Sequence, residues 1–204
     1  MAKRDFYFDN AKFILIVFVV FGHFIRSYIE ENSFIFALYI VIYFFHMPGF
    51  IFVSGFFSKS FHKPGYIKKM AKKMLLPYFI FQTIYSVFYF HLLNEETFKI
   101  DFLIPHWSLW FLLSLFYWNV LLVVFVKWLK LKPATAVIIS FILGLTVGII
   151  GDYSKVLSFA RTFVFFPFFL IGFYLKKEHF FILSNVKTKL LLSAIAISVF
   201  LYAY

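Results

Sequence analysis

The chain has no cysteine, and only 14% of its 204 residues are charged. Without cysteine it can form no disulfide, no thiolate nucleophile and no cysteine-ligated metal site, while the redox compartment stays open. Hydrophobic residues make up 63% of the sequence, so too few polar groups remain to cover the apolar surface of a water-soluble domain. The composition therefore predicts an integral membrane protein.

Seven long apolar runs are separated by short polar stretches, which leaves no room for a separate soluble domain. Lipid permits only helices or closed barrels, and these runs lack the alternation of barrel strands. We therefore predict an all-α fold, a polytopic transmembrane helix bundle of about seven spans in a single domain over residues 1–204. The first run lacks a small-residue cleavage site, so we expect it to be retained. The expected spans are Phe13–Ile29, Phe34–Phe57, Met74–Leu93, Trp107–Val126, Ala134–Ile150, Val156–Leu175 and Leu190–Tyr204.

Basic residues are distributed unevenly between the two faces that these spans define. Sixteen of the 20 lysines and arginines fall before the first span or after the second, fourth and sixth spans. Since basic residues near span ends are retained in the cytoplasm, the amino terminus is predicted to be cytoplasmic. The four exceptions are Arg26, Lys99, Lys155 and Arg161.

The net charge of +11 does not indicate a nucleic-acid ligand, because the charges lie in short clusters beside apolar runs. The largest cluster, in Ser58–Lys73, has two interpretations. It is either a retention signal that fixes the topology or a surface for a phosphorylated donor or anionic lipid headgroups. Its donor-binding candidates are Lys68, Lys69, Lys72 and Lys73.

His23 is the clearest polar residue inside a predicted span. It follows Lys12 by 11 residues, about 16 Å along a helix, which predicts a position near the middle of the bilayer. The two side chains differ by about 20° around the helix, so they share one face with Ile16, Val19 and Arg26. A neutral imidazole there can accept a proton from a hydroxyl. The alternatives are a structural hydrogen bond for His23 and interfacial anchoring for the two cations.

Three further residues are candidates for a substrate site. His46 lies within the second span just before Pro48, where a kink is compatible with a cavity. Ser54 precedes Gly55, a pair that serves equally well as a close-packing seam between helices. Arg161 stands near the start of the sixth span, where it can also anchor the interface. No spacing of histidines and carboxylates predicts a metal site.

Several segments carry a resemblance to a known family. Their order, and the ten-residue gap between Lys12 and His23, are more specific than any one of them. The chain resembles the acyltransferase 3 family, within it the branch similar to fucose 4-O-acetylases. The segments are FDNAKFILIVFVVFGH at Phe8–His23, FFHMPGFIFVSGFFSK at Phe44–Lys59, KKMLLPYFIF at Lys72–Phe81, LWFLLSLFYW at Leu109–Trp118 and FFPFFLIGFYLKK at Phe165–Lys177.

The resemblance implies transfer of an acyl group, usually acetyl from acetyl-CoA, to a hydroxyl of an extracytoplasmic glycan or glycolipid. No resident cofactor is implied, and the expected location is the bacterial plasma membrane. His23 would be the catalytic histidine, as general base or transient acyl carrier, and Lys12 its partner nearer the donor. Arg26, Ser54 and Arg161 would belong to the substrate site. Family members have more spans than the seven expected here, so the domain is expected to be incomplete at its carboxyl end.

A non-enzymatic membrane protein is the competing interpretation, either a glycan or lipid transporter or an inactive truncated relative. Buried histidine and arginine also line transport routes. Transporters commonly have two related halves or broken helices at matching positions, and the sequence has neither feature. A channel is less compatible still, because no filter segment or ring-forming acidic motif is present.

Overall fold

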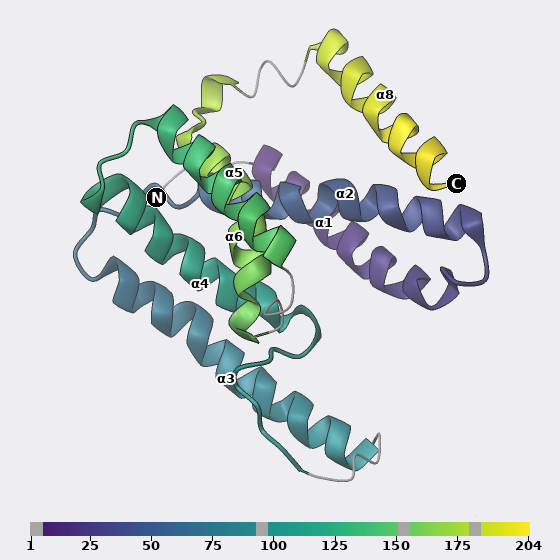
Figure 1. The fold of residues 1–204 in the computed structure, drawn as a ribbon, viewed down its shortest axis with the longest axis horizontal. Helices are drawn as coiled ribbons and strands as arrows, with labels where there is room; N and C mark the ends of the chain where they lie inside the picture. Colours follow the sequence, from purple (N-terminus) through teal and green to yellow (C-terminus); the bar gives the residue numbers. More distant parts are fainter. Residues whose placement is uncertain (1–5, 93–97, 151–155, 180–184) are drawn as a thin grey trace.

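The computed structural model describes residues 6–92, 98–150, 156–179 and 185–204, and these residues form helices and short connections with no strand. The all-α prediction is therefore confirmed. The α-helices are α1 Phe6–Ile25, α2 Ser33–Phe56, α3 Tyr66–Leu92, α4 Trp110–Leu122, α5 Pro133–Ile150, α6 Phe159–Tyr174 and α8 Val186–Ala203 (Figure 1).

Six helical segments in the described residues are long and apolar enough to cross a membrane, and Pro133–Ile149 is a shorter apolar helix. One of the long segments, Trp107–Trp128, joins α4 to the 3-10 turn η2 Trp107–Leu109 and the π-helical turn η3 Val123–Trp128. Another joins α6 to the 3-10 turn η4 Val156–Ser158. The chain is thus an integral membrane protein, as its composition predicts.

Three helices begin at least four residues earlier than the apolar runs suggested. α1 begins at Phe6 rather than at Phe13, α3 at Tyr66 rather than at Met74, and α8 at Val186 rather than at Leu190. Lysine has good helix propensity, so a helix continues past the end of its apolar run into water or headgroups. The four lysines Lys68, Lys69, Lys72 and Lys73 consequently stand on the first two turns of α3.

Helices that follow one another in the chain pack in pairs, α1 with α2, α3 with α4 and α5 with α6, and α6 crosses α2 and α4 (Figure 1). α1 lies along α2 and α3 along α4, while α6 contacts α2, α4 and α5. The core between α4 and α6 contains Trp118, Phe166, Phe169 and Leu170, all without solvent exposure. The indole Nε1 of Trp118 donates a hydrogen bond of 2.7 Å to the Thr162 carbonyl. This bond fixes the start of α6 against α4, where a buried polar group needs a partner.

α2 and α6 cross at their closest point through two glycines. A Cβ added to Gly55 would overlap the Phe169 carbonyl oxygen, and one added to Gly172 would overlap the Phe52 carbonyl oxygen. Both contacts are with backbone atoms, which cannot rotate away. The prediction of close helix approach at Gly55 is therefore confirmed, and Gly172 is its counterpart on α6.

Lys59 joins the ends of α2 and α6. Its Nζ donates to the carbonyl of Leu175 at 2.9 Å and also to that of Phe173. A cation at a helix carboxyl end satisfies carbonyls that lack an intrahelical partner and complements the helix dipole. Partial burial lowers the pKa of the Lys59 ammonium group. We call this end of the bundle, which also holds Lys12 and the start of α3, the lysine end.

The opposite end holds Arg26 and Arg161, and we call it the arginine end. Here Asn32 caps α2, because its side-chain oxygen accepts hydrogen bonds from the amides of Phe34 and Ile35 at 2.9 and 3.2 Å. The segment before α4 is fastened to α3 by Gln82, which donates to the Ile104 carbonyl at 2.8 Å. Both connections next to Arg26 and Trp107 are thus held by side-chain hydrogen bonds.

α8 stands apart from the other helices (Figure 1). None of its spanning window is buried, and its contacts are with α2, including a ring contact between Phe34 and Phe200 at 5.6 Å between centroids. The site described next is built from α1, α2, α4 and α6.

Candidate functional site

A cavity of about 1070 Å³ opens between α1, α2, the start of α4 and the start of α6. Four of the predicted site residues line it, and no aspartate or glutamate is among its described lining residues. Those four are His23, Arg26, His46 and Arg161. The cavity is therefore positively charged, with aromatic walls.

His23 reaches the cavity from the last turn of α1. It is half-buried, and its ring stacks on Trp107 with 6.1 Å between centroids and 23° between planes. Ile16, Val19 and Arg26 of the same face line the cavity too. His23 thus lies nearer the arginine end than the midpoint of α1, while its depth in the bilayer stays a prediction.

His46 lies midway along α2 and is only 1% exposed. Its Nδ1 is 2.6 Å from the carbonyl oxygen of Ile42, one helical turn earlier. Because a carbonyl oxygen can only accept, this contact assigns the proton to Nδ1 and leaves Nε2 of a neutral ring as an acceptor. The Tyr43 ring packs edge-on against the imidazole at 4.7 Å. His46 is thus a second imidazole in the cavity with a fixed orientation.

Arg26 and Arg161 both line the cavity, at its arginine end. Arg26 begins the 3-10 turn η1 Arg26–Tyr28 after α1, and Arg161 lies in the first turn of α6. The guanidinium carbon of Arg161 lies 5.1 Å from the Trp110 ring centroid, which is cation–π distance. Tyr43 lines the same cavity as the two arginines.

Strained backbone surrounds this end of the cavity. Trp107, Leu157 and Ser158 have φ values of 43°, 51° and 55°, a region that residues with a side chain seldom occupy. Such conformations cost about 1–3 kcal/mol each and persist only where the surroundings impose them. Trp107 is the ring that contacts His23, and Ser158 starts the helix that carries Arg161. Trp107 itself lines the cavity, Leu157 and Ser158 precede α6, and a fourth residue with positive φ, Lys130 at 49°, lies outside the cavity lining.

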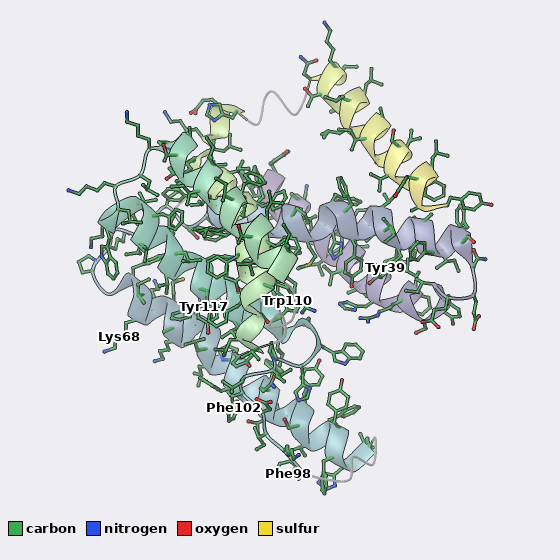
Figure 2. All side chains as sticks on the ribbon, viewed as in Figure 1. Tyr39, Lys68, Phe98, Phe102, Trp110 and Tyr117 are labelled. Atoms are coloured by element: carbon green, nitrogen blue, oxygen red, sulfur yellow. The ribbon has the colours of Figure 1, made fainter. Side chains whose placement is uncertain are left out.

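The other predicted site residues lie outside the cavity lining. Lys12 is half-buried with its Nζ 3.9 Å from the Phe57 ring centroid. Ser54 donates a hydrogen bond of 2.9 Å to the Phe50 carbonyl of its own helix. Lys68, Lys69, Lys72 and Lys73 are exposed, and Figure 2 labels Lys68 near the start of α3. Their roles stay predictions, at the lysine end rather than in the cavity.

Aromatic walls are the part of the site that sequence reasoning missed. Trp107 and Trp110 line the cavity with Tyr39 and Tyr43, although none of the four was predicted as a site residue. Figure 2 labels Tyr39 on α2 and Trp110 at the start of α4. No spacing pattern marks these residues, because they come from two helices whose contact depends on the tertiary fold.

No metal site accompanies these groups in the described part of the chain, where no cluster of three histidine, aspartate or glutamate side chains could hold an ion. The arrangement instead provides two imidazoles, two guanidinium groups and stacking surfaces. Its chemistry is therefore proton transfer and anion or ring binding.

Comparison with known proteins finds one matching family and two similar proteins. The acyltransferase 3 family, described as an acyltransferase domain, matches residues 5–204. The nodulation protein NolL of Sinorhizobium fredii is 29% identical over 189 residues, covering 84% of this chain and 48% of that protein. NolL of Mesorhizobium japonicum is 36% identical over 91 residues, covering 40% of this chain and 24% of that protein.

The chain spans about half the length of the first of these relatives and less of the second. No solved structure matches it. The family match nevertheless extends over nearly all of its residues and includes every helix that forms the cavity. The chain therefore belongs to the acyltransferase 3 family of membrane proteins.

Proposed function

We propose that this protein is an O-acyltransferase that moves an acetyl group from acetyl-CoA to a hydroxyl of an extracytoplasmic glycan or glycolipid. The observation that carries the proposal is the pair of imidazoles, His23 and His46, in one large aromatic cavity of an acyltransferase-family chain. The cavity volume of about 1070 Å³ is enough for a sugar ring together with a reacting acyl group.

His23 is the proposed general base. Its neutral imidazole takes the proton of the acceptor hydroxyl as that oxygen attacks the thioester carbonyl, and the departing CoA thiolate takes up a proton. Stacking on Trp107 holds the ring, and Trp107, which is 65% exposed, offers further surface for a sugar. His46, whose Nδ1 donates to the Ile42 carbonyl, can accept a hydrogen bond from a second hydroxyl of the acceptor at Nε2 and so orient the acceptor.

The donor is proposed to approach from the lysine end, which we place in the cytoplasm of a bacterium. Lys12 and the exposed lysines of α3 lie there, and clustered cations attract the phosphates of CoA. The two substrates would then enter from opposite ends of the bundle. This arrangement explains why a membrane enzyme would carry cations at both ends.

The orientation can be measured in this cysteine-free chain with single introduced cysteines. A cysteine at Lys63 is expected to react with an impermeant maleimide only after the membrane is permeabilised, whereas one at Lys99 is expected to react in intact cells. Both positions are exposed. The reverse labelling pattern would place the lysine end outside and would contradict the proposed direction of transfer.

Replacing Lys68, Lys69, Lys72 and Lys73 with glutamine is expected to weaken acetyl-CoA binding several-fold at low salt. These side chains are exposed, so their attraction for phosphates is screened as ionic strength rises, and wild-type affinity should fall toward that of the variant. Isothermal titration of the protein in lipid nanodiscs at two salt concentrations measures both effects.

The matched control replaces Lys127, Lys130 and Lys132, which are exposed in the connection after α4. Acetyl-CoA affinity that is the same in both variants and insensitive to salt would reduce the α3 lysines to a topology signal.

The direct test of the proposed function supplies acetyl-labelled acetyl-CoA and a glycolipid mixture to the chain in nanodiscs. Label in the glycolipid fraction, with release of free CoA thiol in equal amount, is the expected result. The chain spans about half the length of one relative, so a longer homologue is assayed separately under the same conditions as a positive control. Absence of transfer by the chain beside activity of the homologue would refute catalysis by this polypeptide.

A further inference from the structure

Arg26 and Arg161 have no counter-charge in the described part of the chain. Neither guanidinium group forms an ion pair there, and the described lining of their cavity contains no carboxylate. Glu30 follows Arg26 by one helical turn, but it is exposed and does not line the cavity. Two exposed cations thus line one cavity within segments long and apolar enough to span a membrane, an arrangement that favours an anionic partner.

Both arginine side chains are exposed, and both line the open cavity. Arg161 lies over the Trp110 ring, and Arg26 continues the face of α1 that carries His23. The Tyr43 hydroxyl lies within electrostatic range of both. A guanidinium group offers a planar fork of donors that matches the two oxygens of a carboxylate or a phosphate.

The arginine pair, Arg26 and Arg161, lies far from the lysine end, where the donor is proposed to bind. Lys12 and Lys59 mark the lysine end by their contacts with Phe57 and Leu175, at the ends of α2 and α6. Arg161 stands at the other end of α6, with about 20 Å of helix between it and Tyr174. The phosphates of a donor bound at the lysine end would therefore not satisfy the arginine pair.

We infer that Arg26 and Arg161 form a subsite for an anionic group on the acceptor, so that the acceptor is an acidic glycolipid or glycan carrying a carboxylate or phosphate. The inference rests on the proposed function for the presence of an acceptor in the cavity. A charged group held by the arginines, with its sugar ring beside Trp107 or Trp110, places a ring hydroxyl near His23. The arginine pair then selects acidic acceptors over neutral ones.

Binding, rather than turnover, tests this inference. The chain in phosphatidylcholine nanodiscs is titrated with three glycolipids that share one lipid anchor: glucosyl, glucuronosyl and phosphoglucosyl diacylglycerol. Tryptophan fluorescence reports occupancy beside Trp107 and Trp110. At least one acidic glycolipid is expected to bind about tenfold or more tightly than the neutral one, as one charge-assisted contact would give. Equal affinity for all three would overturn the inference.

Arg26→Gln and Arg161→Gln are each expected to remove that preference while leaving the affinity for glucosyl diacylglycerol within about twofold, which also reports intact folding. Lys99→Gln, which removes a positive charge at an exposed position outside the cavity, should keep the preference for acidic glycolipids. A preference that survives in both arginine variants, or an equal loss of affinity for neutral and acidic glycolipids, would contradict the subsite.

Two compounds, free CoA and phosphatidylglycerol, are added to the binding titration to identify the source of the anion. Free CoA that competes with the acidic glycolipid in an arginine-dependent way would assign the pair to the donor and overturn the inference. If phosphatidylglycerol added to the disc abolishes the preference for acidic glycolipids, the arginine pair binds bulk lipid headgroups, and the inference is overturned. Failure of every glycolipid to bind the wild type would instead refute the proposed acceptor site itself.

Discussion

His23→Ala is expected to lower acetyl transfer by about 10²–10⁴-fold while leaving the folded fraction nearly unchanged. Loss of a positioned general base has that effect on rate, whereas a hydrogen bond between membrane helices is worth on the order of 1 kcal/mol. His23 is half-buried at a cavity wall and stacks on Trp107, so alanine removes a reacting group without opening the core. Turnover at matched protein level and the unfolding temperature in detergent measure the two quantities.

His91→Ala provides the control, because His91 is an exposed histidine in the last turn of α3, outside the cavity. It is expected to keep wild-type turnover. Added imidazole should partly restore transfer by His23→Ala, since it supplies the missing base to an otherwise intact cavity. A His23→Ala protein that loses turnover only in proportion to its folded fraction would favour the structural role for His23.

Hydropathy predicted the helices because each crossing must satisfy its backbone hydrogen bonds within about 20 apolar residues, a constraint that is visible locally. It placed the start of α3 at Met74 because lysines ended the apolar run, although lysine favours helix and the helix begins at Tyr66. Helix ends therefore depended on contacts and solvent that hydropathy does not describe.

Within the site, the sequence predicted what lies on one helix and missed what comes from several. The 100° rotation per residue placed Ile16, Val19, His23 and Arg26 on one face, and all four line the cavity. Trp107, which has a φ of 43° in the turn before α4, contacts His23 on α1. That contact joins residues far apart in sequence, so no local pattern could reveal it.

Gly55→Ala is expected to destabilise the bundle by about 1–3 kcal/mol or more, which is the usual cost of overpacking a close contact. The new methyl group would overlap the Phe169 carbonyl oxygen and lie 2.8 Å from its carbon, so α2 and α6 must separate. α2 carries His46 and α6 carries Arg161, and the same displacement would therefore change the cavity between them. The unfolding temperature in detergent and the binding of a glycolipid measure both consequences.

Gly148→Ala on α5 is the matched substitution. Its added Cβ would meet only the Val164 side chain at 3.8 Å, an ordinary contact, and alanine is the better helix former by about 1 kcal/mol. That variant should unfold at the wild-type temperature or higher, with unchanged binding. If Gly55→Ala and Gly148→Ala unfold at the same temperature, the seam between α2 and α6 is not what holds the two walls of the cavity in place.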